Sequence, residues 1–304
     1  MTDPLRGVLP VLQTPFQEDD AIDWAVLDAE IDHAFQTGAQ GVCTAMVSEY
    51  LKLSQTERRE LNKHVAGQSQ GRGAFVASVG AESTIEAVAN ARWAADAGAT
   101  AVMAIPPTTE ALPDQATLGH FHAIAAVVEI PLIVQDASGY VGKALAQSTC
   151  TTLLDTFGPD RIRFKPEANP IGPKLSALRN ATGGRAKVYD GSGGILLVDS
   201  YRRGITGTMP GVEILPALVA LWNALEAGND DRAYLLSCPI ASLITLQIQS
   251  GLDGFLAVEK YLLKRQGIFT NERRRAPTAF ELDNETRAQV DRLYERLQAA
   301  QAAG

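Results

Sequence analysis

Short runs of β-branched and aliphatic residues alternate with longer Ala- and Leu-rich segments over the first two thirds of this sequence. Eight of these runs have the length and composition of β-strands, and consecutive runs begin about 20 to 34 residues apart. This interval accommodates a strand, a helix and two connecting loops, the unit of parallel α/β folds. The predicted strands are 7–12, 41–46, 74–79, 101–105, 131–135, 162–165, 186–189 and 205–209.

Eight consecutive βα units predict an α/β protein with a closed (β/α)8 (TIM) barrel. The competing architecture is an open doubly wound sheet, which more often has about five to seven strands and a glycine-rich turn after the first. The segment after the first predicted strand, QTPFQEDD, contains no glycine, which favours the barrel. We expect the barrel and its active site in residues 1–227, and a C-terminal helical extension packed on the barrel in residues 228–304.

Two predicted helices begin with a recognisable motif. Ser54 to Glu57 and Ser83 to Glu86 both have the spacing of a capping box, in which a hydroxyl and a carboxylate satisfy free backbone N–H groups at a helix start. Both motifs follow predicted strands, so they support the strand-then-helix order.

Composition indicates an ordinary globular protein. The chain has 304 residues, 46% of them hydrophobic, and a formal charge of −8, which argues against nucleic acid as a partner. The basic run Arg273–Arg275 predicts a solvated linker. The apolar runs are shorter than the ~18 residues of a membrane span, and the amino terminus has acid and proline where a secretory signal is apolar. Cys43, Cys150 and Cys238 form no CxxC pair, so we expect buried thiols in a cytoplasmic protein.

The functional groups of a (β/α)8 barrel project from the carboxyl ends of its strands. The residues that follow the predicted strands form a polar ring that contains a single amine. They are Thr14, Val47, Ser48, Glu49, Pro106, Pro107, Gln135, Asp136, Lys165, Glu167, Asp190, Gly191, Met209 and Pro210.

Lys165 is the most informative member of this ring. The chain has eight lysines against nineteen arginines, and only Lys165 follows an apolar strand at the predicted active face. An amine surrounded by barrel side chains is poorly solvated, which favours the neutral form that attacks a carbonyl. From its position alone, Lys165 is equally well explained as a structural lysine paired with Glu167 or Asp190.

The acidic members of the ring allow a different chemistry. Glu49, Asp136, Glu167 and Asp190 are the oxygen ligands that a magnesium-dependent barrel enzyme would need. Capping and salt-bridge roles explain the same acids, and the four histidines fall on predicted helices. We therefore expect no metal, and keep the magnesium enzyme as an alternative.

The glycine-rich segment 190–196, DGSGGIL, precedes a predicted helix and exposes backbone N–H groups. It matches neither a Walker motif nor a dinucleotide-binding motif in the expected place. A substrate carboxylate or hydroxyl is as plausible a ligand for it as a phosphate.

Several segments together resemble the dihydrodipicolinate synthase / N-acetylneuraminate lyase family of Schiff-base aldolases and dehydratases. They are LPVLQTPF near the start, SEYLKLSQTER after the second strand, AVMAIPP, IPLIVQD and FKPEA around Lys165. The resemblance covers nearly the whole chain and implies a (β/α)8 barrel with a helical extension. It also implies that Lys165 forms an imine with a 2-oxo acid, that Gly191 and Met209 line the pocket, and that the chain forms a homo-oligomer, commonly a tetramer.

The sequence departs from that family at two places. The synthase and the lyase carry two hydroxyl residues followed by Gly-Glu after the second strand, whereas this chain has Met46-Val47-Ser48-Glu49. They also place a proton-shuttling tyrosine at the end of the fifth strand, where this chain has Gln135, and an amide cannot relay a proton. The Gln135-Asp136 pair is instead similar to the branch of 2-oxo-3-deoxy sugar acid dehydratases, such as L-2-keto-3-deoxyarabonate dehydratase. Ser192-Gly193 stand where that branch has an acid.

The resemblance therefore implies a lyase that needs no cofactor beyond the covalent imine with Lys165. Dehydration and aldol cleavage of a small 2-oxo acid, either pyruvate or a 2-oxo-3-deoxy sugar acid, are both compatible with it. The group that replaces the missing tyrosine would be Tyr140, Asp136, Glu167 or a water held by Gln135. Two further alternatives remain: condensation of pyruvate as in dihydrodipicolinate synthase, and a barrel that binds a 2-oxo acid without turning it over.

Overall fold

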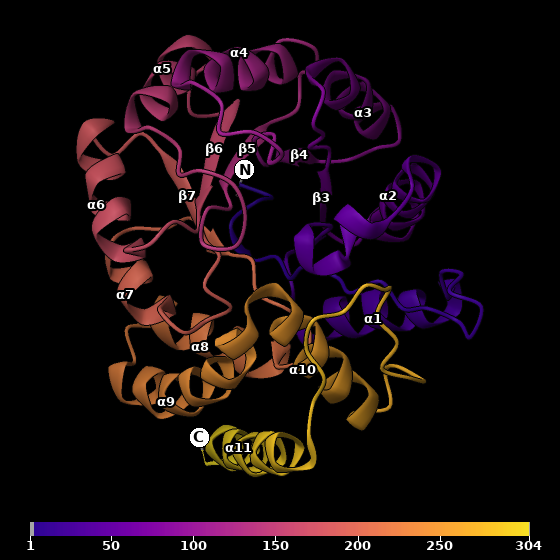
Figure 1. The fold of residues 1–304 in the computed structure, drawn as a ribbon. Coiled ribbons are helices and arrows are strands. Elements are labelled where there is room, and N and C mark those ends of the chain that lie inside the picture. Colours follow the sequence, from indigo (N-terminus) through magenta and orange to yellow (C-terminus); the bar gives the residue numbers. More distant parts are fainter. Residues whose placement is uncertain (1–2, 304) are drawn as a thin grey trace.

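The computed structural model describes residues 3–303 and shows a barrel of eight parallel strands, followed by three helices (Figure 1). A bridge between Val11 and Cys43 joins the segment after the first strand to the second strand, and this contact closes the ring. The strands are β1 (Gly7–Val8), β2 (Gly41–Cys43), β3 (Ala74–Ser78), β4 (Ala101–Ala104), β5 (Leu132–Asp136), β6 (Ile162–Pro166), β7 (Lys187–Asp190) and β8 (Gly207–Thr208). The predicted (β/α)8 barrel is confirmed.

Helices follow the strands in turn and form the outer layer of the barrel (Figure 1). They are α1 (Trp24–Thr37), α2 (Gln55–Ser69), α3 (Thr84–Asp96), α4 (Asp114–Ala125), α5 (Gln147–Phe157), α6 (Ile171–Ala181), α7 (Leu197–Arg202) and α8 (Leu215–Glu226). The extension contains α9 (Asp230–Gln247), α10 (Gly251–Arg265) and α11 (Asn284–Ala302), and the 3-10 turns are η1 (Met46–Ser48), η2 (Tyr50–Lys52) and η3 (Ile248–Ser250).

Three strands, β1, β2 and β8, are shorter than the sequence predicts by three or more residues. After Val8 the chain reaches Pro10, which has no N–H for a ladder, and only Val11 bridges to β2. The predicted second strand, 41–46, stops at Cys43 because Met46 already belongs to η1. β8 covers only two of the residues predicted for it.

The two predicted capping boxes behave differently. Ser54 Oγ accepts from the N–H of Glu57, whose Oε2 accepts from the N–H of Ser54, so this box is confirmed. Ser83 precedes α3 but makes no capping hydrogen bond with its side chain within residues 3–303, and the prediction is wrong there.

The core has an inner and an outer layer. Val76, Met103, Ile133 and Tyr189 are among the buried side chains of the inner layer, and a larger layer lies between the sheet and its helices. All three cysteines are free; Cys43 is buried, whereas Cys150 is half-buried and Cys238 is exposed, so the prediction of buried thiols is correct only for Cys43.

The basic run near the end of the chain is not a solvated linker, contrary to the prediction. Arg274 has a side chain only 6% exposed and pairs with Glu281, while Arg275 pairs with Glu57 at 2.7 Å. The Arg275 guanidinium also lies over the Phe16 ring. Arg275 thus fastens the segment between α10 and α11 to the barrel, whereas Arg274 binds within this segment and to Asp253 of α10.

Within residues 3–303, one helical stretch, Asp230–Arg265, is long and apolar enough to span a membrane by length and composition alone. The stretch bends at Gly251, and its halves α9 and α10 pack on each other. α10 also buries Glu259 and Lys260. The stretch is thus two separate helices, α9 and α10, rather than one continuous helix.

Candidate active site

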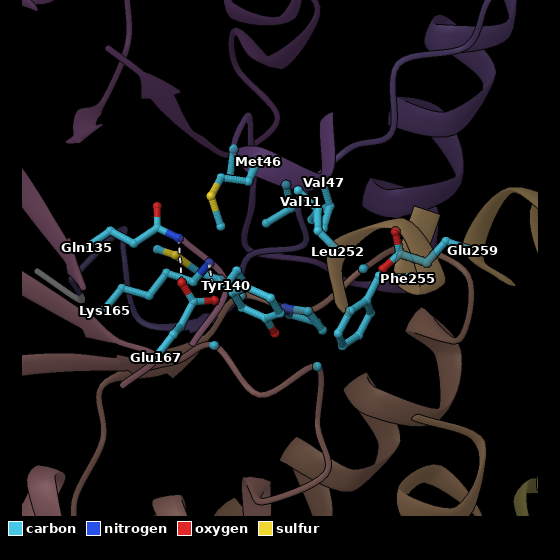
Figure 2. A pocket seen from close by; sticks show the side chains of 16 residues that line it. Val11, Met46, Val47, Gln135, Tyr140, Lys165, Glu167, Leu252, Phe255 and Glu259 are labelled. Atoms are coloured by element: carbon cyan, nitrogen blue, oxygen red, sulfur yellow. Dashed lines mark hydrogen bonds and ion pairs between the residues drawn. The ribbon is translucent and has the colours of Figure 1, made fainter. Parts of the chain in front are cut away.

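A pocket of about 410 Å³, solvent at its mouth included, lies at the carboxyl ends of the strands (Figure 2). Eight of the residues predicted at the active face line it: Val47, Gln135, Tyr140, Lys165, Glu167, Gly191, Met209 and Pro210. The other lining residues are Val11, Ala45, Met46, Gly193, Gly211, Leu252, Phe255 and Glu259. The structure thus brings together side chains from β5, β6, the segments that follow β1, β2, β5, β6 and β8, and the C-terminal extension.

Lys165 is the only amine among the lining residues. It lies on β6 directly beside Gln135 of β5 in the parallel register, so both side chains enter the barrel at the same level. The Lys165 side chain is only 4% exposed, and its Nζ lies 3.2 Å from Glu167 Oε1. A buried amine with one carboxylate partner can exchange a proton with that partner.

Glu167 occupies the centre of the polar group. Lys165 contacts its Oε1, and Gln135 Nε2 donates a hydrogen bond to its Oε2 (Figure 2). Burial raises the pKa of the Glu167 carboxyl above its ordinary value, although Lys165 and Gln135 oppose the rise. A Cβ at Gly191 would lie 2.6 Å from Glu167 Oε1, so a glycine is required there for Glu167 to take this position.

Tyr140 lies on the loop after β5 and packs edge-on against Phe255, with ring centroids 6.0 Å apart. Burial, with Glu167 and Glu259 nearby, raises the pKa of the Tyr140 hydroxyl, which keeps it a neutral donor. Asp136 does not line the pocket. Its carboxylate accepts from the N–H groups of Ser138 at 3.1 Å and Leu145 at 3.0 Å, and so ties together the two ends of the loop that carries Tyr140.

The segments after β1 and β2 contribute less than expected. Among the predicted residues there, Val47 lines the pocket, whereas the hydroxyls of Thr14 and Ser48 donate to the carbonyls of Ser48 and Leu12, each at 2.5 Å. Both hydroxyls are used in backbone hydrogen bonds that shape this corner of the barrel.

Glu49 also lies outside the pocket, in a fully buried ion pair with Lys260 of α10 at 2.5 Å. Lys260 Nζ donates in addition to the carbonyls of Thr14 and Arg273. Glu49 has a φ of 51°, a left-handed conformation that costs a glutamate free energy and persists only where its surroundings hold it. Lys260 therefore joins the barrel to the extension.

The acids proposed as magnesium ligands are held apart by other partners. Asp190 accepts from Ser192 and from Ser200 Oγ, while Asp136 and Glu49 have the partners described above. Within residues 3–303, no group of three or more histidine, cysteine, aspartate and glutamate side chains has the arrangement of a metal site.

The extension supplies pocket residues that sequence reasoning missed. Leu252, Phe255 and Glu259 come from α10, which was expected only to pack on the barrel. The segment LAVEKYLL places the charged pair Glu259-Lys260 inside an apolar helix, and this was the one indication in the sequence that these charges are buried.

Glu259 belongs to a buried group of three carboxyls with Glu30 and Glu213. Gln13 connects two of them, because its backbone N–H donates to Glu30 and its Nε2 donates to Glu259. Gln247 Nε2 donates to Glu213 at 2.7 Å. Burial raises the pKa of all three acids, that of Glu213 to about 7.

These acids predict a pH-dependent stability. Glu213 binds its proton more tightly in the folded protein than in the unfolded chain, so the free energy of unfolding falls as the pH rises from its ordinary pKa of 4.5 to about 7. In the Glu213→Gln variant, the free energy of unfolding should decline less over this pH range, by on the order of 2 kcal/mol. Urea unfolding of the wild type and the variant at pH 5 and pH 8 measures the two declines. An equal decline in both proteins would contradict the raised pKa of Glu213.

Comparison with known proteins agrees with this geometry. The model of the dihydrodipicolinate synthetase family matches residues 4–297. L-2-keto-3-deoxyarabonate dehydratase of Azospirillum brasilense is 28% identical over 298 residues, which are 96% of this chain and 94% of that protein. 4-hydroxy-tetrahydrodipicolinate synthase of Synechococcus sp. (strain CC9311) is 32% identical over 197 residues, 64% of each chain.

Solved structures show the same architecture. Dihydrodipicolinate synthase from Rhodopseudomonas palustris superposes with a TM-score of 0.88 and 26% identity, covering 98% of this chain and 99% of that one. The family model spans nearly the whole chain, and the fold and the pocket agree with it. The chain therefore belongs to the dihydrodipicolinate synthetase family, and it is a lyase.

Proposed function

We propose that this lyase acts on a 2-oxo acid, pyruvate or a 2-oxo-3-deoxy sugar acid, through an imine formed by Lys165. The observation that carries the proposal is the single buried amine in the pocket, 3.2 Å from a carboxylate whose pKa is raised. Attack of the neutral amine on the C2 ketone, followed by loss of water, gives an iminium that acidifies the C3 protons. No metal or organic cofactor is needed for this step.

Glu167 is the residue best placed to move the protons. Its raised pKa suits a group that accepts a proton from C3 and returns it to a leaving oxygen near neutral pH. Gln135 has no proton to relay, but its amide fixes Glu167 Oε2 and so aims Oε1 at Lys165. Tyr140 is the second donor at the pocket wall, and we assign it to hold the substrate.

Glu167→Gln is expected to lower kcat by about 10²- to 10⁴-fold, the usual contribution of a general acid–base group. The amide occupies the same volume and its oxygen still accepts from one of the two donors, Lys165 or Gln135, so the loss reports chiefly the missing proton transfer. Imine formation with pyruvate should remain detectable, since Lys165 is intact. Steady-state kinetics and borohydride trapping measure the two effects, and unaltered kcat would exclude Glu167 from the proton path.

Dehydration is the reaction we favour. The dehydratase of Azospirillum brasilense matches 96% of this chain, whereas the Synechococcus synthase matches 64%. In the enamine, expulsion of the C4 hydroxyl as water needs one proton, which Glu167 can return after removing it from C3. Retro-aldol cleavage of the C3–C4 bond would pass through the same imine, and product analysis distinguishes the two.

Condensation of pyruvate with aspartate semialdehyde is the second candidate, supported by the similarity to 4-hydroxy-tetrahydrodipicolinate synthases. Gln135 stands where that reaction uses a proton-shuttling tyrosine, so we expect little condensation. Rapid turnover in an assay coupled to the following reductase would favour the synthase reaction instead.

The test of the proposal is borohydride trapping. Reduction in the presence of pyruvate or a 2-oxo-3-deoxy acid should leave a stable adduct on the peptide that contains Lys165, in wild type and in the control variant Lys174→Ala. Absence of an adduct would contradict the imine. Loss of turnover on adding EDTA would favour the magnesium alternative, and binding without adduct or product would favour a non-catalytic barrel.

We also propose that the enzyme works in the cytoplasm as a homo-oligomer, with a tetramer expected from the family resemblance. Large apolar side chains on the surface of the single chain support association, and Ile85 is 84% exposed. Leu51, Leu235 and Ile248 are also exposed. Burying such side chains between subunits would remove apolar area from water, and sedimentation equilibrium would give the number of subunits.

A further inference from the structure

A second polar group enters the pocket from the side opposite Lys165: the carboxyl of Glu259 on α10 (Figure 2). Glu259 is only 2% exposed. The wall near it is apolar and includes Leu252, Phe255 and Val11. A ligand held at C2 by Lys165 would extend its carbon chain toward this end.

The two oxygens of Glu259 have different surroundings. Gln13 Nε2 donates to Oε2. Oε1 borders Gly211, another residue of the pocket wall, where an added Cβ would overlap both Glu259 Oε1 and Glu213 Oε2. Because Gly211 has no side chain, Glu259 Oε1 of α10 and Glu213 Oε2 of the segment after β8 can both lie beside it and face each other.

Buried carboxyls that lie close together favour their protonated form, because burial and neighbouring negative charge both disfavour ionisation. Glu30, Glu213 and Glu259 are all buried, and the nearby cation, Lys260, spends its three donors on Glu49 and two carbonyls. Burial and the neighbouring acids raise the pKa of Glu259 well above its ordinary value. Such a carboxyl keeps its proton to a higher pH than an exposed one, and in that form it both donates and accepts hydrogen bonds.

We propose that Glu259 selects substrates by their tail, meaning the carbon chain beyond C3. It favours a 2-oxo acid with a neutral, hydroxylated tail and rejects one whose tail ends in a carboxylate. This inference rests on the proposed function, because it assumes that C2 lies at Lys165. An apolar tail would leave unused the hydrogen-bonding capacity that Glu259 presents to the pocket, and a site built to pair with a hydroxyl discriminates against an analogue that lacks it. A tail carboxylate would lose its hydration at a wall that offers no cation to pair with it, since Lys260 donates to Glu49 and two carbonyls.

Three five-carbon acids test the proposal: 4,5-dihydroxy-2-oxopentanoate, 2-oxopentanoate and 2-oxoglutarate. Binding is measured by calorimetry in a Lys165→Met background, where neither an imine nor turnover interferes. We expect the dihydroxy acid to bind at least about 10-fold more tightly than either analogue, a factor typical of one lost buried hydrogen bond. Glu259→Leu should remove this preference, while Glu259→Gln, which still donates and accepts, should retain most of it.

Glu30→Gln is the matched control, because Glu30 belongs to the same buried acids but does not line the pocket. Its ratio of affinities should equal that of the Lys165→Met background. If Glu259→Leu does not fold, Gly211→Ala tests the same point, since the added methyl displaces Glu259 Oε1 and should reduce the ratio.

A dihydroxy acid that binds no better than 2-oxopentanoate, or a ratio that Glu259→Leu and Gly211→Ala leave unchanged, would overturn the assignment of Glu259. Failure of borohydride to trap pyruvate on Lys165 in the otherwise unaltered protein would instead refute the proposed imine. The calorimetric ratio would still decide the role of Glu259 in that case.

Discussion

Lys165→Met is expected to lower turnover of the proposed 2-oxo acid substrate by roughly 10⁴-fold or more, the scale on which enzymes lose activity without their covalent nucleophile. Methionine fills a similar volume in the pocket, so the fold should be preserved while the amine is removed. Lys165→Arg should be equally inactive, because a guanidinium stays protonated and cannot form the imine. Steady-state kinetics and borohydride trapping would measure the two losses together.

The control for this result is Lys174→Met on α6, outside the pocket, which should retain both turnover and trapping. Retained turnover in Lys165→Met would contradict the imine mechanism directly. If turnover is lost but a pyruvate adduct still forms at another lysine, that lysine and not Lys165 would be the nucleophile. A circular dichroism spectrum matching wild type would show that neither substitution alters the fold.

Lys260→Met is expected to reduce the free energy of unfolding by about 3 to 5 kcal/mol, the cost of breaking a buried ion pair from one side. The substitution leaves Glu49 as an unpaired buried charge, and it removes the donor to the carbonyls of Thr14 and Arg273. Glu49 would also lose the contact that helps to hold its left-handed backbone. Urea unfolding at constant pH measures the effect.

Two further variants test whether the loss comes from the unpaired charge. Glu49→Leu combined with Lys260→Met should recover a large part of the stability, because a buried ion pair replaced by apolar groups is often neutral. Lys264→Met, one turn further along α10, breaks an exposed pair with Glu272 and should cost only about 0 to 1 kcal/mol. Equal losses for Lys260→Met and Lys264→Met would contradict the structural role of the buried pair.

The barrel and its central lysine could be predicted because they depend on local patterns. A strand buried on both faces is apolar along its length, and its helix follows within a short interval, so eight such units can be recognised without knowing their contacts. The carboxyl end of a strand then follows from its last apolar residue. Lys165, Gln135 and Glu167 meet in the pocket for this reason.

Beyond the strand ends, loop geometry decides which way a side chain points, and a pattern of neighbouring residues does not record that geometry. Thr14 and Ser48 follow predicted strands just as Lys165 does, yet their hydroxyls bind backbone carbonyls. Asp136 follows Gln135 directly, but successive residues of a strand face opposite sides. Its carboxylate therefore lies outside the pocket, where it holds the ends of the loop that carries Tyr140.

By itself, the sequence determined the (β/α)8 barrel, the helical extension and the position of the one amine at the active face, since periodic burial and strand ends are local properties. Only the tertiary structure decided that α10 forms one wall of the pocket, with Glu259 opposite Lys165 and Lys260 paired with Glu49, 211 residues away in the chain. Such contacts depend on how the extension packs against the finished barrel, and no pattern of neighbouring residues records that packing.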